Sequence, residues 1–299
     1  MSISATETRH ALRVTETVPP AVALAFLKGD PRENVFLISR IQRSGMTDTR
    51  DPAHGRFLGA FDRDQSLRGL CFIGNTGTLI LSVDEPWVAR EFVEPVLEAG
   101  YRFTIAISEF DAGREFLTRF KKRSGRKPTL DRKQAFYALD ESTLVRKGIK
   151  EIDMEQASLD SIDELTELAC AMVSEDLKLD SDTIDRRHYR LRMTAKVMAG
   201  RPYLCPDTDG PPTFKCDLAV VGSEGALLEG VYTPREYRSK NIATRALWTL
   251  CKDLLRGDDS APFVVLHVDD RNKAARKAYE NVGFQEIATY RLTLLPTAS

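Results

Sequence analysis

The chain has 299 residues, of which 42% are hydrophobic and 29% charged, a composition typical of folded domains and unlike that of disordered segments. Lysine and arginine number 43 against 44 acidic residues, so the net charge of −1 provides no overall basic field for nucleic acid or an anionic membrane. No apolar run approaches the roughly 18–20 residues of a membrane span, and Pro19-Pro20 argues against a secretory leader. Five scattered cysteines without a CxxC pair predict reduced thiols in a cytoplasmic protein, with neither a disulfide framework nor a metal site.

The first half of the chain predicts alternating helices and strands. In chain order we expect two short helices, a hairpin of two strands, a third strand, a helix, a strand, a helix and a last strand. Their ranges are 21–27, 34–41, 56–61, 67–73, 79–83, 87–97, 103–108, 113–120 and 134–139.

The second half predicts two helices, three strands, a helix, a strand, a helix and two terminal strands. Ser161, followed three residues later by Glu164, predicts a capping box at the first of these helices. The ranges are 162–173, 189–199, 203–205, 214–221, 226–233, 242–255, 263–268, 273–281, 285–287 and 289–295.

The two halves end with the same order of elements, namely a long helix, a glycine, a strand, a short helix and a final strand. Gly100 and Gly257 are 157 residues apart, and Phe103 and Phe263 are 160 apart. A repeat at near-constant spacing indicates duplication of one unit, with chance similarity of two α/β halves as the alternative. The sequence therefore predicts an α/β chain, with mixed sheets of the α+β kind, in two tandem domains at 1–145 and 151–299.

A strand at 226–232 leads through a short polar turn directly into the helix that begins near residue 242. Such a turn gathers unpaired backbone N–H groups and the positive end of the helix at one point, which favours binding of an anion. The turn contains neither GxxxxGK[ST] nor GxGxxG, so a Walker loop and a dinucleotide fingerprint are excluded.

Arg238-Ser239-Lys240-Asn241-Ile242-Ala243 resembles the pyrophosphate loop [Q/R]-x-x-G-x-[G/A] of the GNAT superfamily of acetyl-CoA-dependent N-acetyltransferases. Asn272, Ala275 and Tyr279, which share one helix face, are followed by Gly283-Phe284 and resemble a second motif of that family. The resemblance covers residues 152–299. The whole chain further resembles tandem proteins in which a degenerate GNAT-like domain comes first, which implies two domains, each a central mixed sheet flanked by helices.

The resemblance implies acetyl-CoA as co-substrate and no metal. The residues that it places at the cofactor are Val231, Tyr232, Arg238, Ser239, Lys240, Asn241, Ile242, Ala243, Thr244 and Asn272. Asn241 replaces the loop glycine of the family, and we expect it to keep the turn because asparagine tolerates the left-handed region. The alternative is a decayed loop that no longer binds CoA. Asn272 has the alternative of capping its helix.

The resemblance also implies catalytic roles. Tyr279 stands where a family tyrosine protonates the departing CoA sulfur, and its alternative is packing against the sheet. Glu229 lies within the apolar run 226–232, where burial would raise its pKa and suit it to act as general base. Its alternative is a solvent-facing or ion-paired carboxylate, and Asp217 and Glu224 are weaker candidates. Backbone N–H groups of Val231 and Tyr232 would bind the acyl oxygen.

The first half has Asp84-Glu85-Pro86 where the second half has its loop. Two carboxylates at a helix start repel a pyrophosphate, so we expect only the C-terminal domain to bind CoA. The predicted function is direct transfer of an acetyl group to an amine: a small molecule, an amino acid, an aminoglycoside or a protein lysine. No nucleic acid or membrane partner is expected, and monomer and homodimer both remain open. The alternatives are a non-catalytic acyl-CoA-binding regulatory module and, less favoured by the two motifs, a pure interaction protein.

Overall fold

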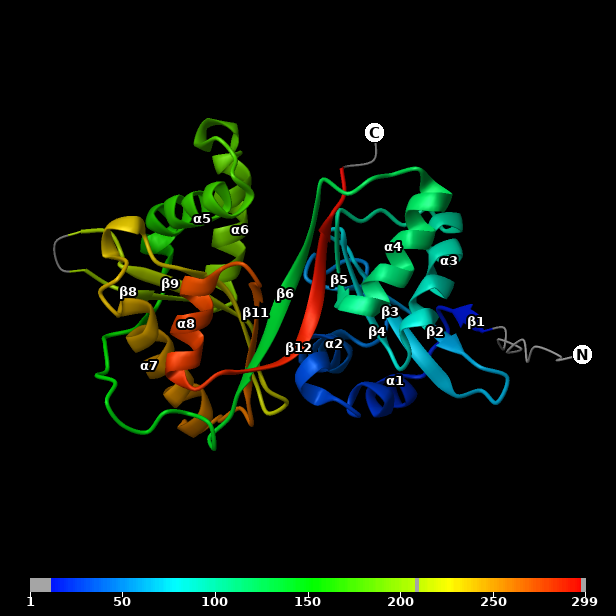
Figure 1. Cartoon of the computed structure of the whole chain (residues 1–299), viewed down its shortest axis with the longest axis horizontal. Helices are drawn as coiled ribbons and strands as arrows, with labels where there is room; N and C mark the ends of the chain where they lie inside the picture. The colour runs from blue at the N-terminus through cyan, green and yellow to red at the C-terminus, as the bar shows by residue number, and fades with distance from the viewer. Residues whose placement is uncertain (1–11, 208–209, 297–299) are drawn as a thin grey trace, which may run out of the picture. The chain divides into compact units, whose positions relative to one another are not determined.

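The computed structural model describes residues 12–207 and 210–296, and the chain divides into two compact units. Unit 1 comprises residues up to 134 together with those from 288 onward, and unit 2 comprises residues 135–287. The division thus falls inside two strands, β6 (Leu130–Leu139) and β12 (Gln285–Leu294), which are both labelled in Figure 1. The compact units therefore differ from the predicted domains at 1–145 and 151–299, because each unit takes a strand segment from the other half of the sequence.

Unit 1 is a mixed sheet with helices on both faces. Its strands follow the hydrogen-bonded order β1 (Arg13–Thr15), β2 (Gly55–Phe61), β3 (Leu67–Gly74), β4 (Thr78–Val83), β5 (Ile105–Glu109), then the end of β12. Neighbours are antiparallel, except for the parallel pair β4 and β5. Phe57 packs against α1 (Pro20–Leu27) and α2 (Pro31–Ser44), whereas its neighbour Leu58 packs against α3 (Val93–Glu98) and α4 (Phe110–Ser124). Because successive residues of a strand point to opposite faces, the two helix pairs cover opposite faces of this sheet.

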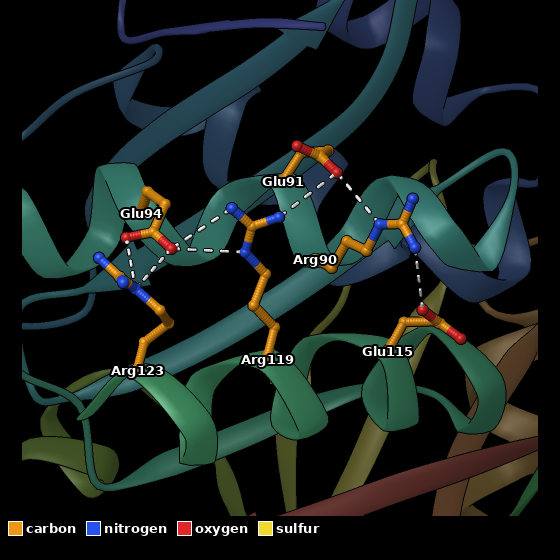
Figure 2. Close-up of polar contacts among 6 residues, drawn as sticks. All are labelled: Arg90, Glu91, Glu94, Glu115, Arg119 and Arg123. Carbon is orange, nitrogen blue, oxygen red and sulfur yellow. Dashed lines mark hydrogen bonds and ion pairs between the residues drawn. The ribbon is translucent and has the colours of Figure 1, made fainter. Parts of the chain in front are cut away.

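A row of ion pairs joins α4 to the helical segment formed by the 3-10 helix η1 (Pro86–Phe92) and α3. Figure 2 shows charged side chains of η1 and α3 facing side chains of opposite charge on α4. Glu94 accepts from Arg119 at 3.3 Å and from Arg123 at 2.9 Å, and Arg90 lies 3.8 Å from Glu115. All these side chains are partly exposed, so each pair contributes about 0–1 kcal/mol and the row of ion pairs mainly fixes how the segments face each other.

Unit 2 is also a mixed sheet covered on both faces. Its order is β7 (Glu155–Gln156), β8 (Pro202–Cys205), β9 (Phe214–Val220), β10 (Ala226–Tyr232), β11 (Val264–Asp269), then residues 135–139 of β6. The strands from β7 to β10 are antiparallel neighbours, and β10 and β11 are parallel. Helices α7 (Ile242–Arg256) and α8 (Lys273–Val282) share one hydrophobic core with Leu228, whereas α5 (Ile162–Leu177) and α6 (Arg186–Met198) share another with Tyr232. None of the helices within the described ranges has both the length and the apolar character needed to cross a bilayer.

Both units have the same order of elements: a strand, two helices, three strands, a helical segment, a strand and a helix. The predicted repeat of element order and the predicted fold class are therefore confirmed.

Three local predictions are wrong. The helix expected at 87–97 is split into η1 and α3, and Pro95, which lacks an N–H donor, explains why one continuous α-helix does not form. The side chain of Ser161 makes no capping bond, since residues 159–161 form a 3-10 turn capped by Ser158. The two terminal strands are one strand, β12.

Candidate functional site

The parallel strands β10 and β11 part near the middle of unit 2. They are paired at only three positions, from Ala226 opposite Val264 to Leu228 opposite Leu266. Beyond Leu228, β10 continues to Tyr232 with no strand partner on its β11 side within the described residues. The backbone of residues 229–232 therefore presents an open edge to a ligand.

The open edge begins with a bulge in β10. On the β9 side, Glu229 lies opposite Asp217, and Tyr232 lies opposite Lys215. Three steps along β10 thus match two steps along β9, which leaves one extra residue in β10. Gly230 takes a φ of +60° there, and a Cβ on it would lie 2.7 Å from Asp217 Oδ2, so a side chain at this position would strain the backbone and displace Asp217.

The turn between β10 and α7 has the conformation that its sequence predicts. Asn241, at the N-cap of α7, has φ 60° and ψ 13°, and Ser239 also has a positive φ of 61°. The expectation that asparagine keeps the left-handed turn is therefore confirmed. No described side chain caps α7, so the N–H groups of its first turn, from Ile242 to Thr244, face outward at the positive end of the helix. This arrangement suits an anion such as a pyrophosphate.

Arg238 supports the turn from within. Its Nε donates to the Thr233 carbonyl at 2.9 Å, and its guanidinium also binds Glu175 of α5 at 2.8 Å. Glu175 further accepts from the Tyr232 hydroxyl at 2.8 Å and from Arg235 at 3.1 Å. Burial alone would raise the pKa of Glu175, but these partners outweigh it and lower that pKa. Sequence reasoning missed Glu175, because 63 residues separate it from Arg238 and nothing local marks it.

Tyr279 lies in α8 and is 5% exposed. Its ring packs against Tyr137 and Phe284, with ring centroids 6.2 and 5.9 Å away, and burial raises the pKa of its hydroxyl. The packing alternative thus describes its surroundings, and the raised pKa keeps the hydroxyl protonated at neutral pH but makes it a weaker acid. Asn272 caps α8, because its Oδ1 accepts from the Ala275 N–H at 3.1 Å. The capping alternative is confirmed for Asn272, and contact with the cofactor stays a prediction.

The expected burial of Glu229 is wrong. Its side chain is 43% exposed, and its carboxylate lies 2.7 Å from Lys196 Nζ of α6. The ion-paired, solvent-facing alternative therefore holds. Two polar residues of β9 next to it are buried instead: Lys215 completely, and Asp217 to 1% exposure. Two charged residues within the otherwise apolar strand 214–220 were the available sequence signal. Asp217 was among the candidates for the base, and Lys215 was not.

The corresponding place in unit 1 differs in charge and conformation. The strands β4 and β5 also part after three parallel pairs, but the cavity of about 360 Å³ there is lined by the carboxylates of Asp30, Glu33, Asp84 and Glu109. No left-handed turn opens η1, whose N-cap Glu85 is extended. The acidic lining and the missing turn support the expectation that unit 1 does not bind a pyrophosphate.

Across residues 12–207 and 210–296, no set of three or more His, Cys, Asp or Glu is grouped to hold a metal ion.

The bulge, the uncapped turn and the tyrosine all fall within one sequence segment, residues 210–284, which matches the model of the Acetyltransferase (GNAT) family. Unit 2 thus contains a segment that matches a GNAT domain. No curated protein matches the chain significantly by sequence. The match to the GNAT family therefore rests on the family model over residues 210–284.

Solved structures share the fold over nearly the whole chain. A GNAT-family acetyltransferase from Colwellia psychrerythraea is 13% identical, with 96% of this chain and 100% of that chain covered and a TM-score of 0.53. A GCN5-related N-acetyltransferase from Sphaerobacter thermophilus is 12% identical, with 96% and 97% covered and a TM-score of 0.58. A tandem GNAT protein from the clavulanic acid biosynthesis pathway is 13% identical, with 97% and 100% covered and a TM-score of 0.52. These likenesses show that the chain shares its fold, over both units, with these proteins, one of which is a tandem GNAT protein.

Proposed function

We propose that the GNAT domain of unit 2 binds acetyl-CoA and transfers its acetyl group directly to an amine. The observation that carries this proposal is the parted strand pair β10 and β11 beside the uncapped, left-handed turn at Asn241. The N–H groups of Ile242, Ala243 and Thr244 would hold the pyrophosphate, with Ser239 and Lys240 beside them. The pantetheine arm would lie along the open edge at Val231 and Tyr232, like an added strand.

Two proton transfers are assigned to side chains: one removes a proton from the amine, and the other delivers a proton to the departing sulfur. The acceptor nitrogen attacks the thioester carbon, the C–N bond forms, and the C–S bond breaks with its electron pair moving to sulfur. Tyr279 would give its proton to that sulfur, and Glu229, which is accessible to solvent, would take the proton of the amine. A covalent acyl-cysteine has no support, because all five thiols are buried.

The test is calorimetry of the full-length chain with CoA and acetyl-CoA, followed by thiol-release assays with a panel of amines. We expect one bound CoA per chain and amine-dependent release of CoA. Absence of binding would refute the proposal, and two bound equivalents would contradict the expectation for unit 1.

One observation favours the alternative of a non-catalytic acyl-CoA-binding module. Glu229 is exposed and paired with Lys196, so the base that the reaction needs is already held by a cation. Binding of acetyl-CoA without thiol release, across primary amines of small molecules and peptides, would support this module over the enzyme.

A further inference from the structure

Lys215 of β9 is fully buried, and its Nζ donates to the carbonyl oxygen of Gly230 at 2.8 Å. The same Nζ lies 3.4 Å from Asp217 Oδ1. Removing an ammonium group from water is costly unless it is paired and hydrogen-bonded, and lysine is rarely found fully buried. The main-chain acceptor that it reaches is the extra peptide of the β10 bulge, next to the open edge.

The geometry of one peptide links this contact to the open edge. The carbonyl of Gly230 and the N–H of Val231 belong to the same trans peptide and point in opposite directions. With the carbonyl held by Lys215, the Val231 N–H points away from Lys215 and its strand β9. A cation on the carbonyl also polarises the peptide, which makes its N–H a stronger donor.

Lys215 is itself held in place by a chain of charges. Asp217 lies between the two lysines, with Lys196 Nζ 2.6 Å from its second oxygen, and Lys196 continues to Glu229. Burial alone would raise the pKa of Asp217, but the two lysines outweigh it and lower that pKa, so the carboxylate stays charged. The bulge is shaped around this chain, since a Cβ on Gly230 would lie 3.0 Å from Lys215 Nζ.

We propose that Lys215 is a positioning residue of the GNAT domain: it orients and polarises the Gly230–Val231 peptide so that the Val231 N–H binds the thioester oxygen of acetyl-CoA. This inference rests on the proposed function. When the amine attacks, the carbonyl electron pair moves to that oxygen, and a preorganised N–H stabilises the charge that forms. Lys215 touches no reacting atom and acts through the peptide alone.

The test uses acetyl-CoA labelled with ¹³C at the thioester carbonyl, whose resonance reports polarisation in the bound state. Lys215→Met removes the ammonium and keeps most of the stem, and Lys215→Met with Asp217→Asn also removes the charge left behind. Both should return the bound resonance toward its free position and lower kcat by up to about 10²–10³-fold, the usual effect of losing one oxyanion donor. The Kd of CoA, which has no thioester oxygen, should stay unchanged, whereas a purely structural role would weaken CoA and acetyl-CoA alike.

Gly230→Ala tests the same peptide from the other side and serves if the lysine variants do not fold. Gly125→Ala in unit 1 is the matched control, because Gly125 has a φ of +70° with no atom within 4 Å of its added Cβ. We expect Gly230→Ala to shift the resonance and Gly125→Ala to leave it unchanged. If the Lys215 and Gly230 variants keep the wild-type resonance and kcat, the role of Lys215 is overturned, while the proposed function still stands. Failure of the wild-type chain to bind acetyl-CoA would overturn the proposed function and this role with it.

Discussion

The backbone conformation of Asn241 allows the pyrophosphate turn to be tested by substitution. Its φ of 60° lies in the left-handed region, which costs an ordinary L-residue about 1–2 kcal/mol and glycine nothing. Asparagine tolerates this region better than most residues, and a β-branched side chain tolerates it worst. We therefore compare the wild-type chain with Asn241→Gly and Asn241→Val.

The conformational cost must appear either in stability or in affinity. If the turn stays left-handed without ligand, valine lowers the free energy of unfolding by about 1–2 kcal/mol and leaves the Kd nearly unchanged apart from crowding. If the unbound turn relaxes, the same energy is spent on binding, and the Kd of CoA rises by about 5- to 30-fold. Asn241→Gly should keep or tighten the affinity, because it relieves both the strain and the bulk.

Calorimetric titration with CoA and denaturant unfolding of the same three proteins separate the two cases. Gln65→Val is the matched control, because Gln65 also has a φ of 60° but lies in unit 1, in the turn between β2 and β3. It should lower stability by a similar amount and leave the Kd of CoA unchanged. Equal stability and equal Kd for Asn, Gly and Val at position 241 would refute the assigned role of this turn.

Three further substitutions address the chemistry and the buried charges. Tyr279→Phe should lower kcat by about 10²–10⁴-fold where thiolate departure limits the rate, with an unchanged Kd for acetyl-CoA; full rate in a single-turnover assay would leave Tyr279 as a packing residue. Glu229→Gln should lower kcat/KM for the amine and flatten its rise with pH, whereas a pH profile that matches the wild type would remove Glu229 as the base. Asp217→Asn should lower the free energy of unfolding at pH 7 by about 3–5 kcal/mol, because it breaks a buried charge pair. The lowered pKa of folded Asp217 stabilises the fold at pH values above the unfolded pKa, near 3.9, and this contribution is lost as the pH falls through the folded pKa. The difference in unfolding free energy between the wild type and Asp217→Asn should therefore narrow in acid. A difference that stays constant in urea melts from pH 7 to pH 2 would contradict this.

The features that were predicted correctly are those that depend on local pattern. Periodicity and breakers gave the order of elements in both units, because apolar spacing and turn residues act over a few neighbours. The turn from Arg238 to Ala243 was predicted with its left-handed residue, since the conformational preference of asparagine is intrinsic to that residue. The cap at Asn272 was among the stated alternatives for the same reason.

The pairing of segments that are distant in the sequence is visible in the folded chain alone. A strand segment has the same local sequence whichever sheet accepts it, so nothing in the sequence signals that the two units divide within β6 and β12. The burial of Glu229 was predicted wrongly, because an apolar run does not show which of its residues face solvent; in the folded chain Glu229 is 43% exposed and paired with Lys196. The pairs of Glu175 with Arg238 and of Lys215 with Gly230 join residues that only the packing of helices and strands brings within hydrogen-bonding distance. Electrostatic interactions in a folded protein depend on distance in space, and distance along the chain does not predict it.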